Sequence, residues 1–263
     1  MGILNVTPDS FSDGGHYADP ESALVHAMQM IDEGADIIDV GGESTRPGSA
    51  SVSDKEQMHR VLGVIRELRR RIPADVPISI DTTSSAVAEA ALDAGANWIN
   101  DTSAGLDSRG MLPLAAERGV PIVLMHRQGM PASMQDNPNY QDAVAEVRAF
   151  LLERVNAALA AGVLEHLILI DPGIGFGKLK EHNLALLAGL TDLANLGMPL
   201  LLGTSRKRFM GSICGETRPE RLAPATCATT ALGVMAGVRV FRVHDVAANR
   251  QAADVAWAIL NVR

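Results

Sequence analysis

Short apolar runs alternate with helix-like segments along the whole chain. The runs are rich in Leu, Ile and Val and lie at residues 3–6, 36–40, 78–80, 98–99, 122–125, 167–170, 200–202 and 238–243. Segments with helical spacing of apolar residues lie between them, each followed by Gly or Pro, at 23–31, 58–72, 86–92, 144–159, 184–196 and 222–235. Because Gly and Pro end helices, these boundaries are well marked. Strands that alternate with helices predict βαβ units and a parallel sheet.

The number of runs indicates how that sheet is arranged. Eight strands and about eight helices in 263 residues favour a closed (β/α)8 TIM barrel over an open sheet. No Pro/Ser-rich linker or shift in composition divides the chain. We therefore expect a single α/β domain over residues 1–263.

Composition and charge exclude several classes of protein. Apolar residues make up 47% of the chain and charged residues 21%, as in an ordinary globular protein rather than a disordered one. The net charge of −8 argues against a nucleic acid or an anionic membrane as partner. The apolar runs are too short to span a bilayer, and no signal pattern begins the chain. The two cysteines, Cys214 and Cys227, form no metal or redox motif, so we expect a cytoplasmic protein.

A cluster of polar residues follows each predicted strand. The clusters begin at Asn5, Gly41, Asp81, Asn100, His126, Asp171, Gly203 and Arg242. In a barrel these strand ends form one face, where active sites are built. Asp81, Asn100 and Asp171 directly adjoin buried runs, where an unpaired polar group costs several kcal/mol. Their convergence predicts a flat, polar ligand that carries several hydrogen-bond donors.

Cationic side chains are expected on the same face of this acidic protein. They are Arg46, Lys207, Arg242 and His244. Ser205 and Lys207 lie where a helix should start, so backbone N–H groups and the helix dipole add to the positive field. This arrangement predicts a site for phosphate or carboxylate.

Residues 5–15 form a longer polar loop than a turn requires, and they include Asn5, Asp9 and Asp13. Other candidate motifs do not fit their usual patterns. "DPGIGFGK" is neither a P-loop nor a dinucleotide fingerprint, and the histidines lack zinc-like spacing. Met125, before His126, is expected in the barrel core, where it could also form the floor of a ring pocket.

Five motifs together resemble the dihydropteroate synthase family of bacterial folate synthesis. They are "GILNVTPDSFSDGG", "IDVGGESTRPG", "DPGIGFGK", "GTSRK" and "RVHDV", in the expected order from the first residue to the last helix. The resemblance implies a (β/α)8 barrel that joins 6-hydroxymethyl-7,8-dihydropterin diphosphate to p-aminobenzoate and releases pyrophosphate. It also implies a homodimer formed through the last helices.

The resemblance assigns roles to residues by motif. The pterin would be held by Asp81, Asn100, Met125, Asp171, Lys207 and Arg242. The diphosphate would be bound by Asn5, Arg242 and His244, with Mg²⁺ at Asn5. The p-aminobenzoate pocket would be formed by Thr45, Arg46, Pro47, Phe176 and Ser205. The catalytic residues would be Asp13, Lys207, Arg242 and His244, with Asp9, Phe11 and Asp13 on a loop that closes over the site.

The chain departs from the family pattern in three places. The usual short extension before the first strand is absent, so either the sequence starts short or the barrel floor is open and stability is reduced. Ser84 stands where many members have Lys, and Thr102 follows Asp101 in "INDTSAG". Two other kinds of protein could also have a pterin-binding barrel. One is a methyltetrahydrofolate:corrinoid methyltransferase, and the other is a paralogue that binds pterin without catalysis. The cations near Lys207 and Arg242 argue against the methyltransferase, which needs no diphosphate site.

Overall fold

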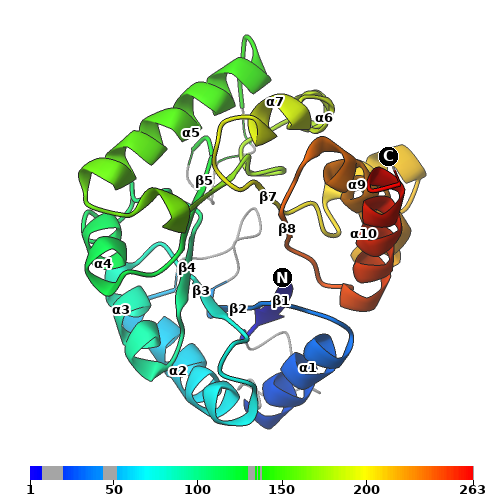
Figure 1. Ribbon diagram of the computed structural model, residues 1–263. Coiled ribbons are helices and arrows are strands. Elements are labelled where there is room, and N and C mark those ends of the chain that lie inside the picture. Colours follow the sequence, from blue (N-terminus) through cyan, green and yellow to red (C-terminus); the bar gives the residue numbers. More distant parts are fainter. Residues whose placement is uncertain (8–19, 44–51, 130–133, 135, 137, 263) are drawn as a thin grey trace.

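The computed structural model describes residues 1–7, 20–43, 52–129, 134, 136 and 138–262. In these residues eight strands alternate with α-helices, and the helices lie outside the ring of strands (Figure 1). The strands are β1 (Gly2–Asn5), β2 (Ile38–Gly41), β3 (Ile78–Asp81), β4 (Trp98–Asp101), β5 (Ile122–Met125), β6 (Ile168–Asp171), β7 (Leu201–Leu202) and β8 (Val240–Phe241). The helices are α1 (Pro20–Asp32), α2 (Asp54–Arg71), α3 (Ser85–Ala94), α4 (Met111–Arg118), α5 (Ala143–Ala160), α6 (Lys180–Ala188), α7 (Leu190–Ala194), α8 (Arg208–Cys214), α9 (Ala223–Ala236) and α10 (Val246–Leu260).

The strands close into a barrel. β1 to β6 pair in parallel in chain order, and β7 pairs in parallel with β8. Two parallel bridges complete the ring: Ile170 with Leu200 joins β6 to β7, and Gly2 with Val243 joins β8 to β1. The predicted (β/α)8 barrel is therefore confirmed.

Side chains alternate between the two sides of each strand and so build two separate apolar layers. Leu4, Ile38 and Ile80 belong to the large core between the strands and the helices. A smaller cluster near the amino ends of the strands consists of Met1, Ile37, Val123, Leu169 and Leu201, with Trp98 and Val240 packed against it. These buried side chains pack together inside the ring of strands.

Polar residues start several of the outer helices. Ser53 caps α2 by accepting a hydrogen bond from the Glu56 N–H, and Asp142 caps α5 by accepting from Val144 and Ala145. α2 and α5, at 18 residues, are the longest helices in the described ranges. None of the helices described is both long and apolar enough to cross a membrane.

The helix predictions differ from the structure in two respects. The segment expected at 184–196 is two helices, α6 and α7, separated by Gly189. A side chain at Gly189 would lie 3.1 Å from both Val144 methyl groups of α5, so close packing favours glycine there. The segments predicted from spacing also do not include α4, α8 and α10. α4 and α8 have only eight and seven residues and therefore give a weak periodic signal, whereas α10 has 15 residues.

Candidate active site

Neighbouring strands place their polar ends in one row. Asn5 pairs in register with Gly41, Gly41 with Asp81, and Asp81 with Asn100. In parallel strands, residues in register project to the same side of the sheet. Further around the ring Asp171 pairs in register with Met125. The structure thus brings the predicted strand-end residues to one end of the barrel.

Two buried carboxylates share one guanidinium group in this region. Arg242 Nε donates to Asp39 Oδ2 and Arg242 Nη2 donates to Asp81 Oδ2, both at 2.6 Å. The Asn100 side-chain amide donates to the same Asp39 oxygen at 3.1 Å. Asp39 is fully buried, and Asp81 and Asn100 are nearly so. Arg242 therefore belongs to the deep part of the site, where it balances carboxylate charge.

The second oxygen of each carboxylate has no hydrogen-bond partner among the residues that the structure describes. Asp39 Oδ1 and Asp81 Oδ1 are buried and unpaired, as is the hydroxyl of Ser79 on β3. Burial raises the pKa of Asp81 to about 7, although the Arg242 charge opposes the rise. Buried acceptors normally have hydrogen-bond donors, so these oxygens indicate a ligand that supplies N–H groups.

Asp171 forms a third buried carboxylate at the end of β6. Its Oδ1 accepts a hydrogen bond from the Gly173 N–H at 2.7 Å. Burial raises the pKa of Asp171 to about 6, while the Gly173 N–H and the charges of Lys207, Arg242 and Lys178 act in the opposite direction. Lys207 and Arg242 therefore act on the same carboxylate, although they come from different loops.

Lys207 lies over an aromatic ring at the mouth of the barrel. Its Nζ is 4.1 Å from the centroid of Phe176, a distance at which a cation is attracted to the ring face. Next to it, Ser205 Oγ lies 2.9 Å from His244 Nδ1 and accepts a hydrogen bond from the His244 backbone N–H. These contacts bring together four of the predicted site residues.

The three consecutive basic residues after β7 have different surroundings. Arg206 forms an ion pair with Asp245 through two hydrogen bonds, at 2.6 and 3.0 Å. Arg208 is exposed at the first position of α8, and Lys207 is the N-cap of that helix. As predicted, Lys207 stands where a helix starts.

Several predicted residues lie outside the described part of the chain. They are Asp9, Phe11 and Asp13 in the first loop, and Thr45, Arg46 and Pro47 after β2. In the described residues no three His, Cys, Asp or Glu side chains are grouped so that they could hold a metal ion. Their roles, and the magnesium assigned to Asn5, stay predictions.

Ser84, where the family commonly has Lys, caps α3 by accepting a hydrogen bond from the Val87 N–H. Two further residues of the site region were missed from the sequence. Asp39 lies in the middle of a predicted buried strand, and its charge in that position was the available signal. Lys178 ends "DPGIGFGK" and is buried with its Nζ against His126. Nothing in the sequence distinguished this lysine from an exposed one.

The geometry agrees with comparisons to known proteins. A sequence model described as "Pterin binding enzyme" matches residues 1–244. The dihydropteroate synthase of Synechocystis is 46% identical over 98% of this chain and 89% of its own length. The Yersinia pestis dihydropteroate synthase, solved in complex with a sulfonamide drug, superposes with a TM-score of 0.93 at 42% identity, covering 100% of this chain and 94% of that chain. The Xanthomonas albilineans enzyme with 4-aminobenzoic acid also gives 0.93, at 46% identity over 100% of this chain and 93% of that chain. The chain therefore belongs to the pterin-binding enzyme family and, within it, to the dihydropteroate synthases.

Proposed function

We propose that the residues at the carboxyl end of the barrel form the active site for the dihydropteroate synthase reaction. In this reaction 6-hydroxymethyl-7,8-dihydropterin diphosphate and p-aminobenzoate give 7,8-dihydropteroate and pyrophosphate. The observation that carries the proposal is the pair of unpaired oxygens on Asp39 and Asp81. They are buried acceptors next to Asn100 and Arg242, in a region otherwise made of apolar strands.

The pterin ring suits this group of residues. Its 2-amino-4-oxo edge carries adjacent N–H donors, which a carboxylate can bind in pairs. Asp81 and Asp171 would accept from the ring, and Asn100 can both donate and accept. Met125 is buried in register with Asp171, so its thioether would contact the ring.

The reaction produces a negative charge and a positive charge, and the site contains side chains that could stabilise each of them. Departure of the diphosphate leaves negative charge on its oxygens and positive charge on the pterin methylene carbon. Arg242, His244 and Lys207 would stabilise the leaving group electrostatically. Asp171 would stabilise the methylene cation, with Asp13 as a second candidate. Because the p-aminobenzoate amine is a weak nucleophile, a dissociative substitution suits this site.

The p-aminobenzoate pocket would lie at the rim. Phe176 offers a ring face, and Ser205 offers a hydroxyl that is held by His244. Thr45, Arg46 and Pro47 would complete this pocket. In such a position the amine of the substrate faces the pterin methylene carbon, and its carboxylate faces the rim.

Magnesium would be held at Asn5. The Asn5 carboxamide oxygen lies near the Gly41 and Asp81 positions, at the same end of the barrel. Mg²⁺ commonly uses few protein ligands together with substrate phosphate oxygens and waters, so a single side-chain oxygen fits it. Bound there, the ion would neutralise diphosphate charge.

A turnover assay tests the activity. Purified protein is supplied with the dihydropterin diphosphate, p-aminobenzoate and Mg²⁺, and pyrophosphate and dihydropteroate are measured together. We expect equal amounts of both products. Binding of both substrates without product would instead indicate a silent pterin-binding paralogue.

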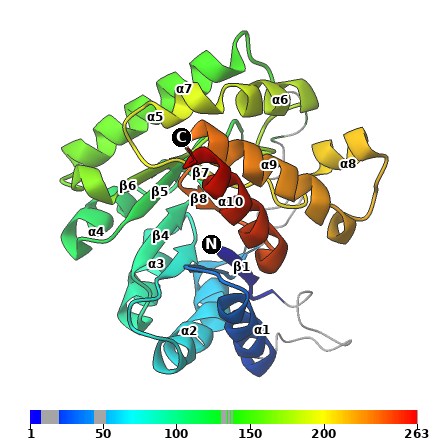
Figure 2. The same ribbon diagram turned by 45° about the vertical axis from the view of Figure 1, so that its right-hand side comes forward.

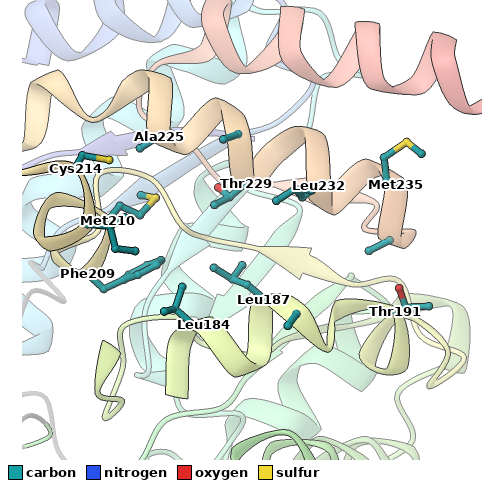
Figure 3. Close-up of a pocket in the computed structure, with 14 residues that line it drawn as sticks. Leu184, Leu187, Thr191, Phe209, Met210, Cys214, Ala225, Thr229, Leu232 and Met235 are labelled. Carbon is teal, nitrogen blue, oxygen red and sulfur yellow. The ribbon is translucent and has the colours of Figure 1, made fainter. Parts of the chain in front are cut away.

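We also propose that the protein works as a homodimer through its last helices. Two apolar grooves on the outside of the barrel support this. One, of about 650 Å³, lies between α6–α7, α8 and α9, and side chains such as Leu187, Phe209 and Met210 line it (Figure 3). The other, of about 520 Å³, lies between α9 and α10, which run side by side (Figure 2). Leu232 and Met235 line both grooves, so the grooves form one continuous apolar surface.

A further inference from the structure

Lys178 is a buried lysine with no direct role in the proposed reaction, and burial lowers its pKa to about 7, although the charge of Asp171 opposes the fall. Only 3% of the residue is exposed. Its Nζ lies 2.9 Å from the Gly173 carbonyl oxygen, 3.0 Å from the Phe176 carbonyl oxygen and 2.8 Å from His126 Nδ1. A fourth acceptor, the His126 carbonyl oxygen, lies 3.4 Å from Nζ, so every contact named for this amine is to a backbone carbonyl oxygen or to the His126 ring.

The imidazole is the acceptor in this group. Burial, together with the nearby charge of Lys178, lowers the pKa of His126 to about 3, so the ring is neutral. When Lys178 is charged it can only donate, so Nδ1 then accepts and the ring proton lies on Nε2. The His126 ring also packs against the Phe150 ring in a T-shaped arrangement, at 4.8 Å between centroids. Lys178 therefore joins the loop after β6 to a fixed residue at the end of β5.

The segment from Gly173 to Phe176, which Lys178 contacts, contains two groups of the candidate site. The Gly173 N–H donates to Asp171, and the Phe176 N–H donates to the Gly173 carbonyl oxygen. The Phe176 ring in turn lies under Lys207 Nζ. A buried charge is costly, and an apolar side chain could fill the same space, so packing alone does not explain a lysine here.

We propose that Lys178 is a positioning residue of the active site. Its ammonium group joins the Gly173–Phe176 turn to the end of β5 and thereby holds the Phe176 ring under Lys207, at the entrance to the p-aminobenzoate pocket. The kinetic part of this inference rests on the proposed function, whereas the position of the Phe176 ring does not.

The first test is a kinetic comparison. Lys178→Met removes the donors at similar volume, and Lys180→Met, at an exposed position two residues later, is the matched control. We expect Lys178→Met to raise KM for p-aminobenzoate about tenfold and KM for the pterin diphosphate by about threefold at most, because small misplacements of binding groups reduce rates steeply. Phe176→Leu should give the same pattern, and the double variant should be no worse than Phe176→Leu alone. Equal rises in both KM values, or additive losses, would overturn the proposal.

The second test needs no substrate. Uniform labelling with 4-fluorophenylalanine gives five ¹⁹F resonances, one for each Phe, and Phe176→Leu assigns that of Phe176. The Phe176 resonance should shift in Lys178→Met and stay unchanged in Lys180→Met. If Lys178→Met does not fold, Lys178→Arg, which keeps the charge but not the geometry, is measured in its place. An unmoved resonance in the folded variant contradicts the proposal. Absence of wild-type turnover contradicts only the proposed function.

Discussion

At the scale of single residues, the site is dominated by carboxylates that have been removed from water. Asp39, Asp81 and Asp171 are all buried, and one guanidinium, that of Arg242, bonds to the first two. Unpaired buried acceptors lower stability in the absence of a ligand and favour binding of one that brings donors. The same groups that would bind the substrate therefore lower the stability of the folded protein when no substrate is bound.

The buried Asp171 carboxylate makes the free energy of unfolding depend on pH. Its pKa is about 6 in the folded protein against 3.8 ordinarily, so between these values the folded state keeps a proton that the unfolded state has lost. The contribution of Asp171 to the free energy of unfolding should therefore fall as the pH rises through that window, by at most about 3 kcal/mol. Asp81, with its raised pKa, adds a fall over the same range and His126, with its lowered pKa, adds a rise, so the share of Asp171 is the difference between wild type and variant. Urea unfolding at about pH 4 and about pH 6.5 measures this fall. Asp171→Asn should show a smaller fall than the wild type, and an equal fall would contradict the assignment.

Asp39 should matter for activity although it was not among the predicted residues. Asp39→Asn keeps a hydrogen-bonding group but removes the charge that faces Arg242. We expect kcat/KM to fall about tenfold or more, since hydrogen bonds between charged groups are worth about 1.5–3 kcal/mol. Asp36→Asn, at an exposed carboxylate paired with Arg250, is the control and should leave kcat/KM unchanged. Wild-type activity in Asp39→Asn would mean that Arg242 needs no second carboxylate.

At the scale of elements, the loop after β6 is held by close backbone contact with the end of β5. A Cβ at Gly173 would lie 1.9 Å from the His126 carbonyl oxygen, and Gly173 has a φ of +63°. Glycine satisfies both the contact and the backbone angle. The loop therefore has little freedom to move away from Asp171.

Gly173→Ala and Gly119→Ala separate these two effects. Gly119 has nearly the same φ, +61°, but nothing within 4 Å of its Cβ position. Gly119→Ala should cost only the strain of the left-handed conformation, about 1–2 kcal/mol, and should leave activity intact. Gly173→Ala should destabilise the protein further and abolish most activity. Thermal unfolding and turnover measure both, and equal effects of the two changes would contradict the role of the contact.

Much of this arrangement could be predicted from the sequence because polarity changes sharply where each strand ends. Asp81, Asn100 and Asp171 stood out because they adjoin apolar runs; in the structure Asp81 and Asp171 are the last residues of their strands and Asn100 is the last but one of β4. Asp39 did not stand out, since one charge within a strand can equally be an outward-facing residue. Lys178 gave no signal because its partners are backbone carbonyl groups and a histidine 52 residues away. Such contacts exist only in the folded chain.

At the scale of the whole molecule, the barrel separates its site from its apolar surface. The polar residues gather at the carboxyl ends of the strands, whereas the large grooves lie on the outside between α6 and α10. Leu232 is 65% exposed and Val255 61% exposed on this surface. Contiguous exposed apolar surface of this kind is typical of protein interfaces.

Leu232→Asp should convert a homodimer to a monomer, because it places a charge at the centre of the shared surface. Leu106→Asp is the matched control, since Leu106 is 57% exposed but lines neither groove. Sedimentation equilibrium distinguishes the two states. A wild-type monomer, or a dimer that survives Leu232→Asp, would exclude this surface as the interface.

The central claim is that buried carboxylates hold the pterin, and its most direct test is calorimetric binding of the dihydropterin diphosphate to wild type and to Asp81→Asn. The amide keeps the size of the side chain but removes its charge and replaces one acceptor oxygen with an NH₂ donor, so only one oxygen is left to accept from the ring N–H groups. We expect affinity to fall about a hundredfold while the protein stays folded, as when a charged hydrogen-bonding pair is lost in a buried site. Unchanged affinity would show that the pterin does not bind at Asp81 and would contradict the account.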